Sequence, residues 1–525
     1  MRILMRFVLS TAWLVAVRAP AQNEASPEIH RDLSPPLSTI HPEAMHSAEI
    51  AAPVDSPDLV RYRQAPLQVL LNFEGIDASS AQPFLYPDVN GAVGETQYVQ
   101  RANPFIAVFD KSTGQLTYGP VVESVFWKEH GSGGVGDCQT STQGDSIVQY
   151  DKLANRWVLL NHAGPTGGPY TMCIAVSQTP DATGQYYQYT IPNIVKFPDY
   201  PKLGVWPDAY YLTYDDLDQN NQFAFLEATA CALDRTNMLT GNLMRPPICF
   251  PTSGPTYHSL LPADLDGTNP PPAGSVNYML DLDGNALNLW TFHVDFNVPS
   301  NSTFSGPFPI QVAPFAPACS VGLYCISQPN TKQRLDPTFD RLMYRLAYRN
   351  YGGHESLVVN HTVGWGGATA IRWYELRPSQ GTLDVFQWGT YPPDIADEYT
   401  RARDTESFAG VSRFPQNRWE GSMAMDRAGN MALGYSVSGT TVFPAIRITG
   451  RLATDSAGTM DEEVSVQQGH GSNLPPNDPK WGYYTSMSVD PFDDCTFWYT
   501  NQYLSASGQG NWRTRIVSFR FSSCP

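Results

Sequence analysis

Residues 485–499 read Thr-Ser-Met-Ser-Val-Asp-Pro-Phe-Asp-Asp-Cys-Thr-Phe-Trp-Tyr and hold one copy of a pattern that recurs along the chain. A short apolar stretch ends in an aspartate turn, and a second apolar stretch rich in aromatic residues follows it. Two such stretches joined by a turn predict a β-hairpin. Because similar hairpins return at intervals, the sequence predicts a repeat architecture built from strands.

The pattern occurs seven times between residue 87 and the C-terminus. Clear copies begin at Tyr-Pro-Asp-Val-Asn-Gly-Ala-Val-Gly (86–94), Gly-Asp-Ser-Ile-Val-Gln-Tyr-Asp (144–151), Pro-Lys-Leu-Gly-Val-Trp-Pro-Asp-Ala-Tyr-Tyr (201–211), Gly-Ser-Met-Ala-Met-Asp (421–426) and 485–490, and less regular copies begin near Ser259 and Arg341. A spacing of roughly 60 residues suits a four-stranded propeller blade with long loops. We therefore predict an all-β, disulfide-bonded β-propeller over residues 67–525, with seven four-stranded blades and with six blades as the alternative.

The two ends of this domain predict how the ring closes. Leu67–Phe73 is the first convincing strand, and Trp512–Phe521 alternates in polarity as a strand does. An N-terminal strand that completes the last blade would close the ring without a covalent link. We expect these two segments to pair in this way.

The N-terminal residues predict export. Residues 1–21 combine Arg2 and Arg6, a short apolar run and Ala19-Pro20-Ala21, as a signal peptide does. Residues 22–66 are rich in Pro, Ser, Ala and His and are expected to form a disordered leader. The chain is therefore predicted to be secreted, into the extracellular space or the periplasm. No later segment is long and apolar enough to span a membrane.

Charge and cysteine content agree with export. The formal net charge of −17 repels phosphate backbones, which argues against nucleic-acid binding. Eight cysteines, an even number, indicate disulfides in a secreted chain. The sequence does not fix their connectivity. We expect nearest neighbours to pair, because each bridge then stays within one repeat or its loop: Cys138–Cys173, Cys231–Cys249, Cys319–Cys325 and Cys495–Cys524.

The segment Ser488–Trp498 resembles the Asp-box hairpin of sialidase-type (BNR-repeat) propellers, Ser-x-Asp-x-Gly-x-Thr-Trp, with Phe492 at the glycine position. The resemblance implies a structural role, in which the Asp490 side chain ties the turn and Trp498 packs between strands. Most of residues 86–525 also resembles a group of secreted bacterial propeller proteins. That second resemblance rests on Pro87-Asp88 with 91–94, Phe197–Lys202, Gly204–Tyr211, Asp340–Arg345, Arg418–Ser422 and Trp481-Gly482-Tyr483. It implies no particular reaction.

Sialidase-like chemistry would use an arginine cluster, a tyrosine–glutamate pair and an aspartic acid. Residues of these types stand near the starts of repeats, and the catalytic candidates are Asp340, Arg341, Arg418, Glu420 and Tyr483. The candidate ligand-binding residues are Asp199, Lys202, Trp206, Asp208 and Trp481. The alternative interpretation is that such Arg and Asp residues cross-link adjacent blades around the channel. Large aromatic residues near strand starts could stack on sugars or pack between blades. We expect two or three of them to be exposed, from Trp206, Tyr210, Tyr211, Trp419, Trp481, Tyr483 and Tyr484.

Asp-Leu-Asp-Gly occurs at 264–267 and again at 281–284. Carboxylates at alternate positions can surround a calcium ion with oxygens, although the complete twelve-residue calcium loop is absent. Asp-Gly is also common in tight turns. Plain turns are the favoured interpretation, and structural calcium bound by Asp264, Asp266, Asp281 and Asp283 is the alternative.

Two functions are compatible with these observations. The first is a secreted module that recognises carbohydrate or another surface, with a polysaccharide or glycoconjugate as partner. The second is an extracellular glycoside hydrolase or lyase of sialidase-like fold, with its pocket at the channel mouth. The sequence narrowly favours the first, because no catalytic motif is complete. A hydrolase would show two neighbouring carboxyl groups, one with a raised pKa, whereas a binding module would show a shallow aromatic surface.

Overall fold

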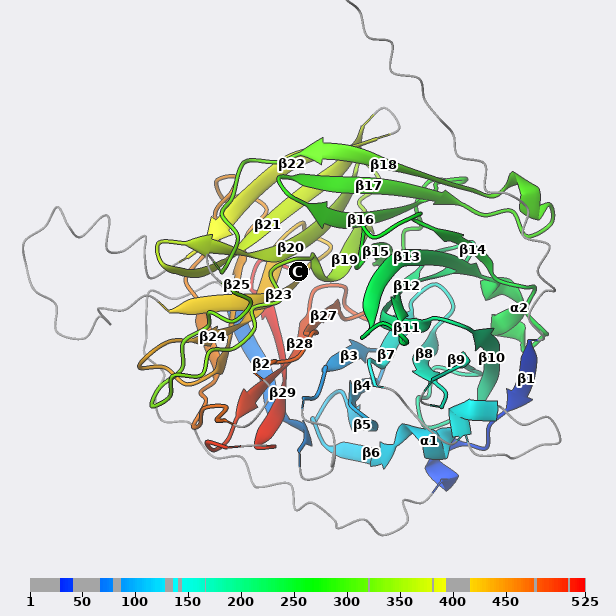
Figure 1. Ribbon diagram of the computed structural model, residues 1–525, viewed down its shortest axis with the longest axis horizontal. Helices are drawn as coiled ribbons and strands as arrows, with labels where there is room; N and C mark the ends of the chain where they lie inside the picture. Colours follow the sequence, from blue (N-terminus) through cyan, green and yellow to red (C-terminus); the bar gives the residue numbers. More distant parts are fainter. Residues whose placement is uncertain are drawn as a thin grey trace, which may run out of the picture.

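The computed structural model describes residues 29–40, 67–78, 86–127, 136–139, 144–165, 167–319, 322–379, 382–392, 416–475, 479–508 and 510–524. Its strands form sheets that are arranged around a common centre (Figure 1). In these residues helix is confined to short segments: α1 (Glu123–Phe126), α2 (Arg235–Thr240), and the 3-10 turns η1 (Leu37–Thr39), η2 (Gly136–Gln139) and η3 (Pro299–Asn301). The all-β class and the propeller arrangement are thus confirmed.

Five sheets stand as separate blades, each an antiparallel meander. The first three along the ring are β3 (Asn90–Val93), β4 (Gln97–Ala102), β5 (Phe105–Asp110), β6 (Leu116–Val122); β7 (Ile147–Asp151), β8 (Arg156–Ala163), β9 (Tyr170–Ser177), β10 (Tyr186–Ile194), with β1 (His30–Leu33) outside β10; and β11 (Phe197–Val205), β12 (Tyr210–Asp218), β13 (Ala224–Leu233), β14 (Ile248–Pro251). The other two are β23 (Asn417–Met425), β24 (Met431–Ser438), β25 (Ala445–Arg451), β26 (Val464–Gln467); and β27 (Ser486–Val489), β28 (Phe497–Leu504), β29 (Trp512–Phe521), β2 (Leu67–Asp77).

The remaining sheet has eight strands and contains two meanders. They are β15 (Leu261–Asp266), β16 (Asn277–Asp283), β17 (Ala286–His293), β18 (Thr303–Gln311); and β19 (Met343–Asn350), β20 (Glu355–Trp365), β21 (Ala368–Ser379), β22 (Thr382–Tyr391). β15 pairs with β16 only at Leu261 and Pro262, and from Ala263 onward it pairs in parallel with β19. The predicted count of seven, or alternatively six, separate blades is therefore corrected, because this parallel ladder joins two meanders into one sheet.

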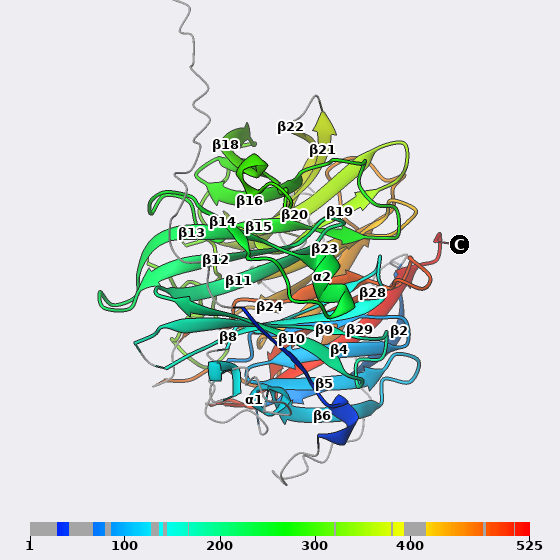
Figure 2. The same cartoon turned by 90° about the vertical axis from the view of Figure 1, so that its right-hand side faces the viewer.

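The innermost strands contact one another in a closed circle of β3, β7, β11, β15, β19, β23, β27 and β3 again. In the side view of Figure 2 the strand groups β15–β18, β11–β14, β7–β10 and β3–β6 lie one above the other. Gly204 of β11 shows how close neighbouring strands come, since a Cβ there would lie 2.5 Å from the carbonyl oxygen of Ala263 in β15. Side chains from different sheets therefore meet at the centre of the ring.

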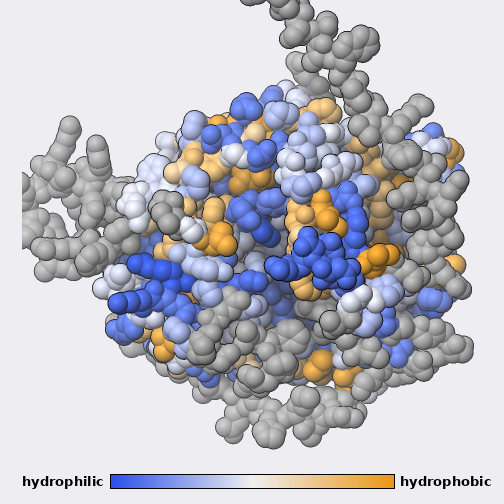
Figure 3. All heavy atoms as spheres, viewed as in Figure 1, coloured by the Kyte–Doolittle hydropathy of each residue, from blue (hydrophilic) through white to orange (hydrophobic). Residues whose placement is uncertain are grey.

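Ion pairs occupy part of the ring centre. Arg345 of β19 pairs with Asp264 (Nε–Oδ2 2.6 Å) and Asp266 (Nη2–Oδ1 2.7 Å) of β15 and donates to the carbonyl oxygen of Met487 in β27 (3.0 Å). Lys152 also pairs with Asp266 (2.9 Å). Burial alone would raise the pKa of Asp266, but the charges of Arg345 and Lys152 hold it well below its usual range. Hydrophilic residues also gather near the centre of the face seen in Figure 3.

The ring closes as predicted. β2 pairs antiparallel with β29, from Leu67 opposite Phe521 to Asp77 opposite Arg513. Arg515 of β29 adds an ion pair to Glu74 of β2. The first and last strands of the domain therefore share one sheet, which confirms that hydrogen bonds join the two ends of the ring.

Part of the predicted disordered leader is ordered, which corrects that prediction for residues 29–40. β1 pairs antiparallel with β10, from His30 opposite Thr190 to Leu33 opposite Tyr187, and Leu37 is fully buried. The hydrogen-bond partners of β1 lie in β10, so the composition of the segment could not reveal the pairing. The predicted signal peptide, residues 1–21, and the remainder of the leader lie outside the described residues. Among the described residues, no helix has the length and hydropathy that a membrane crossing requires.

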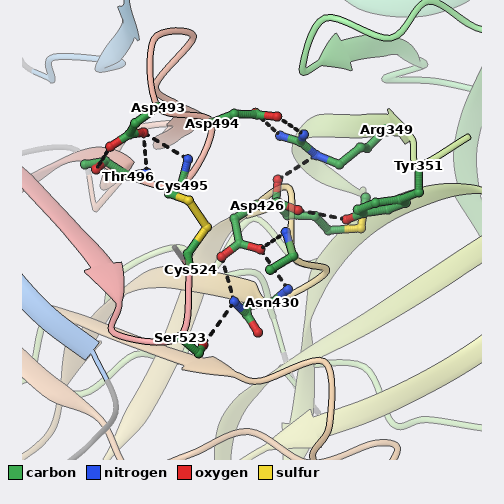
Figure 4. Close-up of a disulfide and its surroundings, with 12 residues drawn as sticks. Arg349, Tyr351, Asp426, Asn430, Asp493, Asp494, Cys495, Thr496, Ser523 and Cys524 are labelled. Atoms are coloured by element: carbon green, nitrogen blue, oxygen red, sulfur yellow. Dashed lines mark hydrogen bonds and ion pairs between the residues drawn. A yellow bond between two sulfur atoms is a disulfide. The ribbon is translucent and has the colours of Figure 1, made fainter.

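The four disulfides join nearest neighbours as predicted: Cys138–Cys173, Cys231–Cys249, Cys319–Cys325 and Cys495–Cys524. The last of them ties the turn between β27 and β28 to the end of β29 (Figure 4). Beside it, Arg349 of β19 forms an ion pair with Asp494 in the turn (2.7 Å) (Figure 4). The disulfide and the ion pair therefore both hold this turn against other parts of the ring.

The β27–β28 turn has the structure that the Asp-box resemblance implies. Asp490 accepts hydrogen bonds from the backbone N–H of Phe492 (2.9 Å) and from the indole N–H of Trp498 (3.3 Å). Trp498 is buried and stacks on Tyr98 of β4, with ring centroids 5.3 Å apart. The structural roles expected for Asp490 and Trp498 are confirmed.

We expect the Cys495–Cys524 bridge to stabilise the fold more than the Cys319–Cys325 bridge. The first joins cysteines 29 residues apart and the second joins cysteines only 6 apart. Because a longer closed loop removes more entropy from the unfolded chain, replacing both cysteines by serine should cost about 3–4 kcal/mol at the first bridge and about 2 kcal/mol at the second. Denaturant unfolding of the two double variants measures this difference. An equal loss at both bridges would contradict the prediction.

Candidate functional site at the channel mouth

A residue with left-handed backbone conformation lies at or near the start of each innermost strand. These residues are Asp88 (φ 40°), Asp145 (52°), Tyr200 (54°), Ser259 (54°), Thr338 (47°), Glu420 (48°) and Gly482 (142°). Few residue types other than glycine, asparagine and aspartate adopt positive φ readily, and such strain concentrates at functional sites. The recurring sequence pattern is thus also a recurring backbone turn.

Hydrogen bonds join these strand starts side by side. The Asp88 carboxylate accepts from the backbone N–H of Tyr483 (2.8 Å), which links the start of β3 to the start of β27. The Thr338 hydroxyl donates to the Glu420 carboxyl (3.1 Å), which links the segment before β19 to β23. The strand starts therefore meet at one end of the ring, which we term the channel mouth.

Four aspartates lie together at the channel mouth and are termed the acidic mouth: Asp88, Asp145, Asp199 and Asp215. Burial raises the pKa of Asp88 well above its usual value, and the charges of Asp145 and Asp199 raise it further. Asp215 of β12 accepts hydrogen bonds from the backbone N–H (2.8 Å) and the hydroxyl (3.1 Å) of Ser259. Within the described part of the chain, no ion pair joins these four to a cation, and the carboxyl groups of Asp145 and Asp199 accept no hydrogen bond.

Asp199 holds the carboxyl group best suited to proton transfer. Its side chain is half-buried, at a bulge in β11 between Asp199 and Lys202. Burial, followed by the charges of Asp145 and Asp215, raises its pKa to about 7, although Arg341 and Lys202 act in the opposite direction. At neutral pH this carboxyl group is therefore about half protonated and can donate or accept a proton.

Tyrosines form one wall of the mouth and are termed the tyrosine cluster: Tyr200, Tyr344, Tyr483 and Tyr484. The fully buried ammonium group of Lys202 lies 3.1 Å from the ring centroid of Tyr200 and 4.0 Å from that of Tyr484. It donates to the backbone carbonyl oxygens of Tyr200 and Pro201, and burial lowers its pKa well below the usual value. The hydroxyl groups of Tyr200 and Tyr484 are buried without a hydrogen-bond partner among the described residues.

Arg341 and Asp340 lie at the rim of the mouth. They form a bidentate ion pair (Nε–Oδ1 2.8 Å, Nη2–Oδ2 3.0 Å), and the Asp340 side chain is 50% exposed. The Arg341 guanidinium lies 4.7 Å from the ring centroid of Tyr200 and 5.9 Å from that of Tyr483. The structure therefore brings together these predicted site residues: Asp199, Lys202, Asp340, Arg341, Glu420 and Tyr483.

Other predicted residues lie away from the mouth. Arg418 is buried and pairs with Glu463 beside β26 (3.0 Å). Trp206 and Trp481 bury their rings in the core, at 1% and 3% exposure. Asp208 is exposed in the turn before β12. None of these four side chains makes a contact with the acidic mouth that would support the ligand-binding or catalytic role predicted for it.

The expectation that two or three of the aromatic residues near strand starts are exposed is wrong. Tyr483 is half-buried. The other six residues are buried: Trp206, Tyr210, Tyr211, Trp419, Trp481 and Tyr484. Large rings fill the space between neighbouring sheets, where they bury more apolar surface than they could at the rim. The mouth therefore offers no broad aromatic platform built from these residues.

The four predicted calcium ligands do not converge on one site. Asp264 and Asp266 are held in the ion pairs at the ring centre. Asp281 accepts a hydrogen bond from the indole N–H of Trp290 (3.3 Å), and burial raises its pKa to about 7, while Asp283 is exposed at the end of β16. Among the described residues, no group of three or more His, Cys, Asp or Glu side chains is placed to hold a metal ion. Structural calcium therefore stays a prediction, and the positions of these four aspartates do not support it.

Asp88, Asp215 and Tyr200 are absent from the catalytic and ligand-binding candidates that the sequence predicts, whereas Asp145 and Tyr484 stand near strand starts as other candidates do. Asp88, Asp145 and Tyr200 occupy the left-handed position at a strand start, so alignment of the repeats on that position would have found them. Asp215 belongs to a second strand, β12, and no repeat signal marks it.

No protein-family model and no curated protein matches the chain. Among solved structures it is similar to a thermostable family-43 glycoside hydrolase (11% identity, 58% of this chain and 95% of that chain, TM-score 0.30) and to the exo-β-1,3-galactanase of Phanerochaete chrysosporium (10% identity, 87% and 97%, TM-score 0.30). It is also similar to the apocarotenoid oxygenase of Synechocystis (8% identity, 72% and 74%, TM-score 0.35). At these identities and TM-scores, none of the three bears on what this chain does.

Proposed function

We propose that the protein is a glycoside hydrolase whose reaction takes place at the channel mouth. The observation that carries this proposal is the half-buried Asp199 carboxyl, with a pKa of about 7, among the other carboxyl groups of the acidic mouth. A carboxyl group that is protonated at neutral pH can protonate the oxygen of a glycosidic bond, while a neighbouring carboxylate acts at the sugar. Asp145, whose charge acts on Asp199, is the candidate for that second role.

The arrangement favours cleavage over recognition alone. Recognition without chemistry would be served by a shallow aromatic surface, and the aromatic residues considered for it are buried. It would also gain little from several buried carboxyl groups, because burying a charge without a partner costs free energy. Such a cost is typical of sites where proton transfer needs a shifted pKa.

The reaction is proposed to take place outside the cytoplasm. Four disulfides support an oxidising compartment, such as the extracellular space or the periplasm. A secreted enzyme at this location would meet polysaccharides and glycoconjugates rather than intracellular metabolites.

The test is incubation of the purified protein with a panel of polysaccharides, followed by measurement of released reducing ends and of unsaturated sugar. We expect release from at least one polymer by the native chain and loss of release in Asp199→Asn. Asp384→Asn is the matched control, because it removes an exposed carboxylate from β22, the outer edge strand of the eight-stranded sheet. Retention on a polymer without any release would reject the enzyme and support a recognition module.

A further inference from the structure

The channel mouth holds more acidic groups than its cations neutralise. Beside the acidic mouth lie further carboxyl groups, those of Asp336, Asp340 and Glu420. Arg341 donates two hydrogen bonds to the Asp340 carboxylate. Lys202 donates to backbone carbonyl oxygens rather than to a carboxylate. The charges of Arg341, Lys202 and Lys480 lower pKa values within the acidic mouth, but among the described residues no ion pair joins any of these three to its four carboxyl groups.

Buried tyrosine hydroxyl groups lie close to the acidic mouth, since the charge of Asp145 acts on both Tyr200 and Tyr484. Tyr200 and Tyr484 are 3% and 2% exposed, and neither hydroxyl has a hydrogen-bond partner among the described residues. The Tyr484 hydroxyl lies close enough to Asp145 that, after burial, the charge of Asp145 contributes most to its raised pKa. Because buried polar groups are normally hydrogen-bonded, these hydroxyls point to an occupant that offers them acceptors.

The occupant has to satisfy two kinds of group at once. The carboxyl oxygens of Asp145 and Asp199 accept no hydrogen bond from the described residues and can take donors, and the hydroxyls of Tyr200 and Tyr484 need an acceptor or a donor. A sugar that carries an ammonium group offers three charged N–H donors beside hydroxyl oxygens. A sugar carboxylate would bring acceptors and a further negative charge to carboxyl groups that already repel one another.

We propose that the channel mouth selects saccharides that carry an ammonium group, such as oligomers of 2-amino sugars, over neutral and acidic saccharides. The inference rests on the proposed function, since it presumes that the ligand of the mouth is a saccharide. The acidic mouth supplies the attraction, and the tyrosine cluster supplies ring faces of the kind that already hold Lys202.

Binding of a cation at this place should release a proton. The charged groups that act on Asp199 are the carboxylates of Asp88, Asp145 and Asp215 and the cations Lys202 and Arg341. With a pKa of about 7, Asp199 is mostly protonated at pH 6, and a bound ammonium group favours its ionised form. Up to about one proton per bound ligand should therefore leave the protein at pH 6.

The experiment uses the full chain and isothermal titration calorimetry at pH 6 and low temperature, in two buffers of different ionisation enthalpy. The probes are oligomers of equal length made of glucosamine, N-acetylglucosamine and galacturonic acid. We expect the glucosamine oligomer to bind about tenfold more tightly than the N-acetylglucosamine oligomer, with a preference that weakens as salt rises. Proton release should accompany only the glucosamine oligomer.

Matched variants separate the mouth from the overall negative charge. Asp199→Asn should abolish the proton release and reduce the preference for the glucosamine oligomer, whereas Asp384→Asn, which removes one exposed carboxylate on β22, should change neither. Equal effects of the two variants would overturn the inference, because the preference would then arise from net charge alone.

The outcomes also separate the inference from the proposed function. If the neutral oligomer binds as tightly as the glucosamine oligomer, or the acidic oligomer binds best, charge selection is wrong while saccharide binding stands. If none of the three oligomers binds, the inference is overturned, and failure of the polysaccharide panel as well would overturn the proposed function.

Discussion

Asp199→Asn is expected to lower kcat/KM for glycoside cleavage by about 10²–10⁴-fold, the usual contribution of a general acid. The asparagine amide has nearly the same shape as the carboxyl group but cannot donate a proton to the leaving oxygen. The Asp199 carboxyl accepts no hydrogen bond from the described residues, so the substitution should leave the fold intact. Steady-state kinetics on the polymer identified by the panel measures the loss, and a thermal melt within a few degrees of the native chain verifies the fold.

The pH dependence distinguishes a lost acid from a damaged site. With a pKa of about 7, Asp199 is protonated below pH 7 and ionised above it, so the rate should fall about tenfold per pH unit above pH 7. This alkaline limb should be absent from the residual activity of Asp199→Asn. Because the charge of Arg341 lowers the pKa of Asp199, Arg341→Gln should move the limb to higher pH. An alkaline limb that stays in place in both variants would mean that another group supplies the proton.

Features that follow from local or periodic sequence signals could be predicted. The alternation in Trp512–Phe521 and the isolated apolar strand at Leu67 were enough to predict the pairing that closes the ring, because each segment shows strand character by itself. Nearest-neighbour disulfides could be predicted because each bridge stays within one repeat or its loop, as with Cys231 and Cys249, which lie opposite each other on β13 and β14.

Features that depend on distant partners could not be predicted. The parallel ladder between β15 and β19 pairs Ala263 with Leu346. The sequence of neither strand indicates that the other strand is its hydrogen-bonding partner. The same holds for β1, whose composition is that of a loop and whose order comes from the free edge of β10. Hydrogen-bond partners supplied by another part of the chain leave no trace in composition.

The candidate site was predictable only where it follows the repeat. Asp199, Arg341 and Glu420 stand at or near strand starts, and the structure brings them to one mouth. Trp206 follows the end of β11 and Trp481 precedes β27, and both rings are buried in the core. Residue type and distance from a strand start therefore do not distinguish a site residue from a packing residue. The direction of the side chain is also needed.

Arg345→Met is expected to lower the free energy of unfolding by about 3–5 kcal/mol, because it leaves buried carboxylates without their partner. Arg345 and the two aspartates that it pairs with, Asp264 and Asp266, have side chains no more than 2% exposed. In the variant only Lys152 would still face Asp266 (2.9 Å), and Asp264 would lose its counter-ion. Methionine keeps most of the side-chain volume, so the loss reports charge rather than a cavity. Denaturant unfolding at pH 7 measures it.

Acid should reduce this difference between the native chain and Arg345→Met. The pKa of Asp266 is held below its unfolded value by Arg345 and Lys152, so its contribution to stability is present above the unfolded pKa of about 4 and is lost as the pH falls toward the folded pKa. The gap between the two chains should therefore narrow below about pH 4.

A surface ion pair provides the control for the Arg345 network. Lys196 pairs with Glu227 at side-chain exposures of 38% and 21%, and Lys196→Met should cost less than about 1 kcal/mol, because water and salt screen an exposed pair. Asp264→Asn in the Arg345→Met background should recover part of the lost stability, since it removes the carboxylate that has no partner. A loss at Arg345 no larger than that at Lys196 would mean that the ring centre is held by β-sheet contacts alone, and that its ion pairs contribute no net stability.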